Sequence, residues 1–159
     1  MELEIERKFF VLKIPDLTAL KSISDERYYL YSGNGVELRF QARGDKYELE
    51  RMSENGNLSR SQEKIKITKE EFEVLKPLGK GPIIRESYLI SESPQITIKI
   101  YHGKFEGLVR AEVEFKSLEE AKKFQPPDWL GKEMIDSPVA RDANLVSMDE
   151  EEFRKSIRS

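Results

Sequence analysis

The sequence predicts an α+β fold dominated by antiparallel β-sheet, with a single domain spanning residues 1–159. Three observations lead to this prediction. Apolar and charged residues alternate with a period of two along most of the chain, short turn signals separate the alternating runs, and few segments carry helix-start signals. Strands joined by short turns pair antiparallel, and about eight of them can close into a barrel, which removes free sheet edges.

The strands are predicted from residues that share a face. In the first strand Leu3, Ile5 and Phe9 alternate with charged residues, and Arg7 interrupts the apolar side. Each such run has one apolar face and one charged face. Five later runs repeat the alternation, at residues 36–43, 46–52, 60–67, 96–101 and 110–115. Two further strands are expected at residues 28–31 and 83–90.

Turn-forming residues separate the runs. Glycine and asparagine accept the positive φ angles that tight hairpin turns need. The expected turns lie at residues 32–35, 43–45, 54–57 and 102–103.

Four helices are expected. Three of them begin with the spacing of a capping box, in which a hydroxyl and a carboxylate three residues later bond to each other's backbone N–H groups. These pairs are Thr68 with Glu71, Ser117 with Glu120, and Ser147 with Glu150. A fourth, short helix is expected from Pro15 to about Ser22. Trp129, after two prolines, is expected to cover the core.

A barrel made from such strands can be arranged in two ways. The apolar faces can line the interior, or they can face outward beneath the helices. The second arrangement places the charged faces inside a tunnel. The alternation alone leaves both arrangements open.

Composition narrows the classes of function. The formal net charge of −3 gives no basic excess for nucleic acid, and the absence of cysteine excludes thiolate chemistry and indicates a reducing compartment. No apolar run approaches the ~20 residues that span a bilayer, and the N-terminus lacks a signal-peptide core. We therefore expect a soluble, cytoplasmic protein without a membrane or nucleic-acid partner, whose oligomeric state stays open.

Acidic pairs on two strands form a candidate metal site. Glu4 and Glu6 share a strand face with Lys8, about 7 Å apart at each step. Glu112 and Glu114 repeat the arrangement. Four converging carboxylates repel one another unless a cation lies between them, and a hard divalent cation such as Mg²⁺ or Mn²⁺ takes oxygen ligands. Taken singly, each pair is more often a solvated strand face.

Basic residues complement the acidic pairs. Six of them fall on the charged faces of expected strands: Arg39, Arg43, Arg60, Lys64, Arg85 and Lys99. Arginine holds phosphate oxygens in a bidentate manner and lysine acts as a point charge. Acids and bases together favour a ligand that combines a metal with polyphosphate, although each base alone can equally be a surface residue.

The pattern Glu-x-Glu-x-Lys of residues 4–8 resembles the signature of the CYTH superfamily, the triphosphate tunnel metalloenzymes. Further similarities follow in the same order along the whole chain. They are Glu37 with Arg39, Leu58-Ser59-Arg60, Arg85 ahead of Tyr88, Glu112 with Glu114, the Pro-Pro-x-Trp segment at residues 126–133, and Arg141 with Asn144.

The resemblance implies an eight-stranded closed tunnel with a charged lumen and flanking helices. It also implies hydrolysis of inorganic, thiamine or nucleoside triphosphates, or cyclisation of ATP, for which this chain is short. By this resemblance Mg²⁺ or Mn²⁺ would be held by Glu4, Glu6, Glu112 and Glu114. The phosphates of a triphosphate-containing small molecule would be bound by Lys8, Arg39, Arg60 and Arg85. Glu4, Glu6 and Lys8 would act at the reacting phosphoryl group.

The chain departs from the family pattern at several tunnel positions, where acids or bases are replaced. The replacing residues are Gln41, Met52, Gln62, Lys64, Ser87, Thr97 and Lys99. Three hypotheses follow. The first is a metal-dependent triphosphatase. The second is a catalytically weakened module that binds polyphosphate or a nucleotide. The third is a structural barrel with solvated charged faces.

Overall fold

The computed structural model of the protein describes residues 2–56 and 59–158. The described residues contain nine strands: β1 Glu2–Val11, β2 Ser22–Gly33, β3 Val36–Arg43, β4 Lys46–Glu54, β5 Ser59–Ile67, β6 Lys80–Glu92, β7 Gln95–His102, β8 Val109–Glu114 and β9 Leu130–Glu133. They also contain the helices α1 Lys69–Leu75, α2 Leu118–Lys123, α3 Asp142–Leu145 and α4 Glu150–Arg158. Short 3₁₀ turns lie at Lys76–Leu78, Gly103–Phe105 and Pro138–Ala140.

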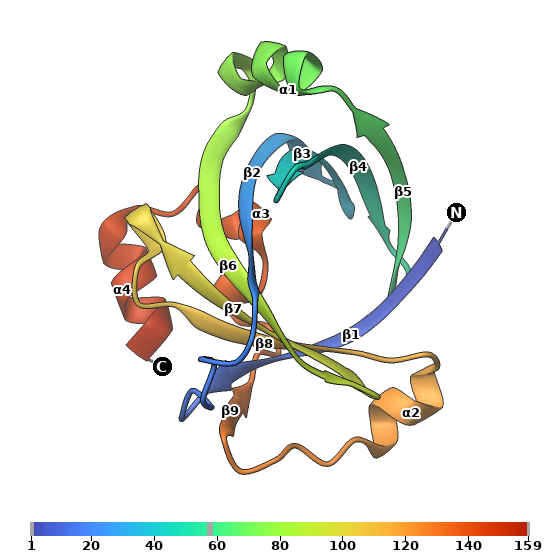
Figure 1. The fold of residues 1–159 in the computed structure, drawn as a ribbon, viewed down its shortest axis with the longest axis vertical. Coiled ribbons are helices and arrows are strands. Elements are labelled where there is room, and N and C mark those ends of the chain that lie inside the picture. Colours follow the sequence, from blue (N-terminus) through green and yellow to red (C-terminus); the bar gives the residue numbers. More distant parts are fainter. Residues whose placement is uncertain (1, 57–58, 159) are drawn as a thin grey trace.

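The sheet closes into a barrel (Figure 1). Its order is β5-β4-β3-β2-β6-β7-β8-β1-β9, and β1 also pairs with β5. All strand pairs are antiparallel, as the turn spacing predicts. Strand β1 closes the ring because Glu2–Ile5 pair with β5 and Glu6–Phe10 pair with β8. The predicted eight-stranded barrel is confirmed, and β9 is one strand more than the sequence indicated.

The apolar faces point outward beneath the helices. Phe72 of α1 packs against Tyr28 and Phe40, which lie on the outer side of β2 and β3. On the opposite wall Phe9 and Val113 belong to a cluster that Phe124 and Trp129 cover. The second of the two arrangements left open by the alternation is therefore correct, and the charged faces line the lumen.

The segment that follows β9 closes part of one end of the lumen. Ile83 lies two residues from Arg85 on β6, and Tyr101 lies two residues from Lys99 on β7. Residues two apart share a strand face, so Ile83 and Tyr101 point into the barrel. There they pack against Val139 and Leu145 and, further out, against other members of the same cluster. An apolar plug therefore fills this end of the barrel. Among the described residues no helix has the length and apolar character to cross a bilayer.

Two of the predicted helix starts are confirmed. Thr68 and Glu71 form both bonds of the capping box at α1. Ser117 accepts from the Glu120 backbone N–H at α2, but the Glu120 carboxylate accepts from the backbone N–H of Lys116 rather than from that of Ser117.

Two predictions about helices are wrong. Residues 15–21 form an irregular loop with a turn at residues 18–19, in which the Asp16 side chain accepts from the Thr18 N–H, and Ser22 already belongs to β2. Helix α4 begins later than expected. Its first N–H groups bond to Asp149 instead of Ser147, since Asp149 Oδ1 accepts from Glu152 N at 2.8 Å.

The hairpin turns follow the predicted chemistry. Asn34 and Gly35 both have positive φ, which places a tight turn between β2 and β3. Gly44 does the same between β3 and β4. Two residues of the predicted patterns lie outside the described residues. They are Asn57, in the turn expected at residues 54–57, and Leu58, in the segment Leu58-Ser59-Arg60 that resembles the family pattern.

A carboxylate and arginine lumen as the candidate active site

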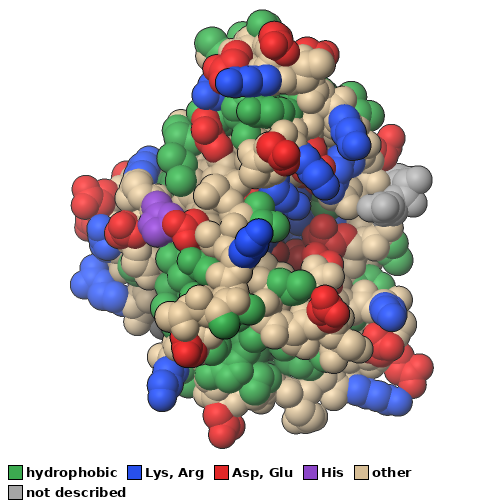
Figure 2. All heavy atoms as spheres, in the orientation of Figure 1, with side chains coloured by type: hydrophobic (Ala, Val, Ile, Leu, Met, Phe, Trp, Pro, Cys, Tyr) green, Lys and Arg blue, Asp and Glu red, His purple; other side chains and the backbone are tan. Residues whose placement is uncertain are grey.

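The lumen contains a cavity of about 540 Å³. Its wall carries ten Lys or Arg and seven Asp or Glu side chains, an excess of three positive charges in a chain whose net charge is −3. Figure 2 shows this hollow with basic and acidic side chains on its walls. Because charges in a concave, partly dry site act more strongly than on an open surface, the cavity favours anions.

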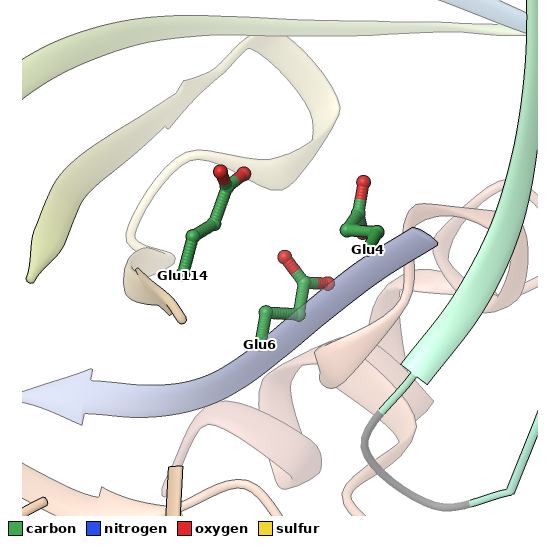
Figure 3. Close-up of side chains that lie close together, drawn as sticks. All are labelled: Glu4, Glu6 and Glu114. Atoms are coloured by element: carbon green, nitrogen blue, oxygen red, sulfur yellow. The ribbon is translucent and has the colours of Figure 1, made fainter. Parts of the chain in front are cut away.

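Three carboxylates converge on one side of the lumen. One ligand atom from each of Glu4, Glu6 and Glu114 lies within 4.8 Å of the others. Glu4 and Glu6 come from β1, and Glu114 lies opposite Glu6 across the β1–β8 pair. Figure 3 shows the three side chains directed toward a common space. We refer to Glu4, Glu6 and Glu114 as the carboxylate triad.

The pKa directions of the triad indicate that its bases compensate the three acids only in part. Burial and the neighbouring Glu6 raise the pKa of Glu114 to about 7, and the same two causes raise the pKa of Glu4. Glu6 is different: although burial opposes its ionisation, Lys8, Arg60 and Lys99 together lower its pKa. Three carboxylates this close, two of them reluctant to ionise, form the kind of oxygen-rich site that a divalent cation stabilises. The triad therefore fits a metal.

Glu112, the fourth predicted metal ligand, is held by bases instead. Its oxygens lie 2.9 Å from Lys99 Nζ and 2.9 Å from Arg110 Nη2. Although burial opposes ionisation, Lys99 and Arg110 keep the pKa of Glu112 well below its usual range. Three of the four predicted carboxylates therefore converge, and the fourth, Glu112, lies beside them in ion pairs.

The predicted bases Arg60, Arg39 and Lys8 line the same cavity. Arg60 lies 3.3 Å from Glu4, 3.8 Å from Glu6 and 3.3 Å from Glu37, while Arg39 lies 3.3 Å from Glu37. Lys8 Nζ donates to the Ala140 carbonyl at 2.7 Å and lies 3.3 Å from Glu6. These cations are therefore pre-positioned by acids and must exchange partners to hold a phosphate.

A second hollow of about 1140 Å³ meets the first at Glu4 and Glu6. Glu4, Glu6, Lys8 and Arg60 line both cavities. Its wall includes the end of β4 and much of the segment after β9, which the Arg141–Glu54 ion pair joins.

Comparison with known proteins identifies the family. The chain is 33% identical to an inorganic triphosphatase of Nitrosomonas europaea over 137 residues, which are 84% of this chain and 89% of that protein. It is 27% identical to an inorganic triphosphatase of Acetivibrio thermocellus over 96% of this chain and 98% of that protein. No protein-family profile matches the chain.

The barrel is also similar to a solved inorganic triphosphatase. The TM-score is 0.66 and the identity 29%, over 94% of this chain and 97% of the other. The chain belongs to the CYTH superfamily of triphosphate tunnel metalloenzymes. The colinear sequence motifs predicted this membership, and the closed barrel with its charged lumen agrees with it.

Arg85 occupies a different place from the other bases that the CYTH pattern indicated. It is fully buried and does not lie on the cavity wall. Its guanidinium contacts Asp142 and lies 3.2 Å from Asp25. Arg85 therefore holds acidic side chains beneath the lumen surface.

The positions that depart from the CYTH pattern are integrated into the lumen. Gln41 accepts from Arg27 at 2.7 Å and donates to Glu50, and Gln62 donates to Glu50 at 2.5 Å. Lys64 lies 3.6 Å from Glu48. Together with Lys99 on Glu112, these contacts show an interior in which substituted residues neutralise or hydrogen-bond remaining acids. Met52 is buried, and Ser87 and Thr97 line the cavity.

The sequence interpretation did not assign a role to Arg27, Arg110 or Asp142, which line the inner part of the cavity. Arg27 could have been found, because it shares one face of β2 with Asp25 and Tyr29. That strand was predicted to begin only at Tyr28. Asp142 lies outside any alternating run, so it carried no pattern that marked it.

Proposed function

We propose that this chain hydrolyses inorganic or small organic triphosphates within a single tunnel domain over residues 1–159, with Mg²⁺ or Mn²⁺ as cofactor. The observation that carries the proposal is the carboxylate triad set into a cavity with an excess of basic side chains. Membership in a family with curated inorganic triphosphatases supports it. The absence of cysteine favours a cytoplasmic location.

In this proposal Glu4, Glu6 and Glu114 hold the cation. A divalent cation there supplies charge neutralisation at phosphoryl oxygens and a water of lowered pKa. Arg39 and Arg60 bind the non-reacting phosphates through planar guanidiniums, which match phosphate oxygens. Both arginines now contact acidic side chains, Arg39 with Glu37 and Arg60 with Glu4, so a bound phosphate would have to share or displace these partners.

Lys8 lies at the reacting end. The Ala140 carbonyl orients its ammonium, and Glu6 lies 3.3 Å away. Positioned donors of this kind act mainly on the charge that spreads over phosphoryl oxygens during transfer. Glu112 contributes indirectly, because it fixes Lys99 and Arg110 at the cavity wall.

A second candidate function is a binding module without turnover. One observation favours it: the Lys99 ammonium lies 2.9 Å from Glu112, so a carboxylate that could complete a larger metal site is engaged. A lumen of this kind retains its phosphate-binding bases but has fewer groups to activate water. The solvated-barrel hypothesis is wrong for Arg39, Arg110 and Glu112, which are at most 7% exposed.

The proposal is tested with the purified chain, tripolyphosphate, and Mg²⁺ or Mn²⁺. We expect phosphate release that depends on the metal and falls at least about 100-fold in Glu6→Gln, because the cation contributes several kcal/mol. The matched control is Glu63→Gln, an exposed position on the outer side of β5, which should keep wild-type activity. Binding of tripolyphosphate without release would establish the binding module. Neither binding nor release with any triphosphate would reject both functions.

A further inference from the structure

One carboxylate in the lumen belongs to no strand. Asp142 begins α3, in the segment that plugs one end of the barrel. Its side chain reaches the cavity wall while remaining only 3% exposed. Its neighbours along the chain, Ala143 and Leu145, are also buried, so the segment fixes the carboxylate in place.

Four donors surround this carboxylate. Arg27 Nη1 and Tyr101 Oη donate to it at 3.0 Å and 2.6 Å, and Arg110 Nη2 donates at 3.1 Å. Arg85 Nη1 donates to it as well. The donors come from β2, β6, β7 and β8, so four strands contribute to one anion-binding position.

The position has the properties of a phosphate site. Three guanidiniums and a phenol around one oxyanion match the charge and donor requirement of a phosphoryl group. Although burial opposes ionisation, Arg85 and Arg110 keep the pKa of Asp142 well below its usual range. Arg85 Nη2 is buried and has no hydrogen-bond partner among residues 2–56 and 59–158, so the cluster holds more donors than its acids use.

Asp142 also marks the inner end of the cavity. Along β6, the lumen-facing residues pass from Leu89, 43% exposed, through Ser87 to Arg85 and Ile83, both fully buried. Asp142 contacts the buried end of this series. A phosphate chain entering from the exposed rim therefore meets a fixed negative charge at the innermost anion-binding position.

We propose that Asp142 sets the length of the polyphosphate that the lumen accepts, by occupying with its own carboxylate the position that a further phosphate would take. This inference rests on the proposed function, because it concerns the selectivity of the same cavity. It assigns Asp142 a role in specificity and none in the reaction itself.

Chain length gives the direct test in the unaltered protein. Binding and metal-dependent phosphate release are measured for pyrophosphate, tripolyphosphate, tetrapolyphosphate and a long polyphosphate. The wild type should discriminate against the longer chains by at least about tenfold in kcat/KM or Kd, which is the effect of one unpaired like-charge contact of roughly 1.4 kcal/mol. Equal acceptance of all lengths would overturn the inference. Failure with every length would instead reject the proposed function.

Two variants separate the volume of Asp142 from its charge. Asp142→Ala vacates the position and should raise the ratio of tetrapolyphosphate to tripolyphosphate kcat/KM by about tenfold or more. Asp142→Asn removes the charge but keeps the volume and should raise the ratio less. The matched control is Asp25→Ala, which also removes a buried carboxylate from Arg85, 3.2 Å away, but does not lie on the cavity wall. An equal rise in the control would overturn the inference.

A stability measurement covers variants that fold poorly. An anion that replaces the missing carboxylate should raise the melting temperature of Asp142→Ala in inorganic phosphate by several degrees more than that of the wild type or of Asp25→Ala. The same small rise in all three proteins would contradict an anion site at this position. If no variant at residue 142 folds even in phosphate, the wild-type length series decides alone.

Discussion

Two groups of carboxylates lie in the same lumen and are in opposite electrostatic states. The carboxylate triad has three acids within 4.8 Å, and the pKa values of Glu4 and Glu114 are raised. Asp142 has one acid among three guanidiniums, and its pKa is well below the usual range. In the first group Arg60 and Lys8 pair with Glu4 and Glu6 but leave like-charge repulsion between the acids, whereas in the second the bases outnumber the acid.

The difference separates a binding site from an internal support. The triad is strained by like charge until a cation arrives, so its ligand is external to the chain. The Asp142 cluster contains its own anion, so removing that carboxylate leaves buried guanidiniums uncompensated, and removing Arg85 takes a buried partner from both Asp142 and Asp25. Acidic residues in one barrel can therefore serve either purpose, and the number of nearby bases distinguishes the two.

The largest effect should come from breaking the Asp142 cluster. Arg85→Met removes a fully buried partner of Asp142 and Asp25 and should destabilise the chain by about 3–5 kcal/mol in urea unfolding. The matched control is Arg43→Met, because Arg43 lies 2.9 Å from the same Asp25 but its side chain is 34% exposed. Its replacement should change the unfolding free energy by at most about 1 kcal/mol. Equal losses would show that burial does not distinguish these pairs.

A smaller effect, of opposite sign, should come from the triad. The pKa of Glu114 is raised in the folded chain from 4.5 to about 7, so its repulsion reduces stability as pH rises through that range. Without metal, the unfolding free energy of Glu114→Gln should therefore exceed that of the wild type above about pH 7, by about 1 kcal/mol after solvent screening. The variant should melt at a correspondingly higher temperature. The difference should vanish near pH 4.5. A mutant less stable than the wild type at high pH would contradict the electrostatic interpretation of the triad.

The same variant should lose the response to metal. Mg²⁺ or Mn²⁺ should raise the melting temperature of the wild type above pH 7 and have little effect on Glu114→Gln. Equal stabilisation of both proteins would place the cation elsewhere.

The smallest effect should come from an ion pair on the surface. Lys123 lies 2.7 Å from Glu119 on α2, and both side chains are about three-quarters exposed. Lys123→Ala should shift the melting temperature by no more than about 2 °C and leave phosphate release unchanged. A larger shift would mean that ion-pair geometry outweighs burial in this chain.

Most of the barrel follows from local patterns. Strand β3 begins and ends where alternation predicted, and the capping box at Thr68 predicted the start of α1. Glu4, Glu6 and Lys8 could be placed on one strand face because side chains alternate with a fixed period. That Glu114 lies opposite Glu6 depends on the sheet order, which no local pattern contains.

The missed features depend on distant or very short segments. Strand β9 has four residues and no alternating run, and it exists because β1 offers an edge. Asp142 lies 115 positions from Arg27, so neither residue marks the other in the sequence. The incorrect helix at residues 15–22 arose because Pro15 and Asp16 favour helix starts and turns alike.

The position of β1 has a consequence for the order in which the strands of the barrel pair during synthesis. Its partners β5, β8 and β9 end at residues 67, 114 and 133, so β1 is synthesised before all three of them and is among the last strands to find all its neighbours. Glu4 and Glu6 are therefore synthesised more than a hundred residues before Glu114. Pairing over such separations closes slowly. The acidic pocket of Glu4, Glu6 and Glu114 can therefore form only after β8 has been synthesised.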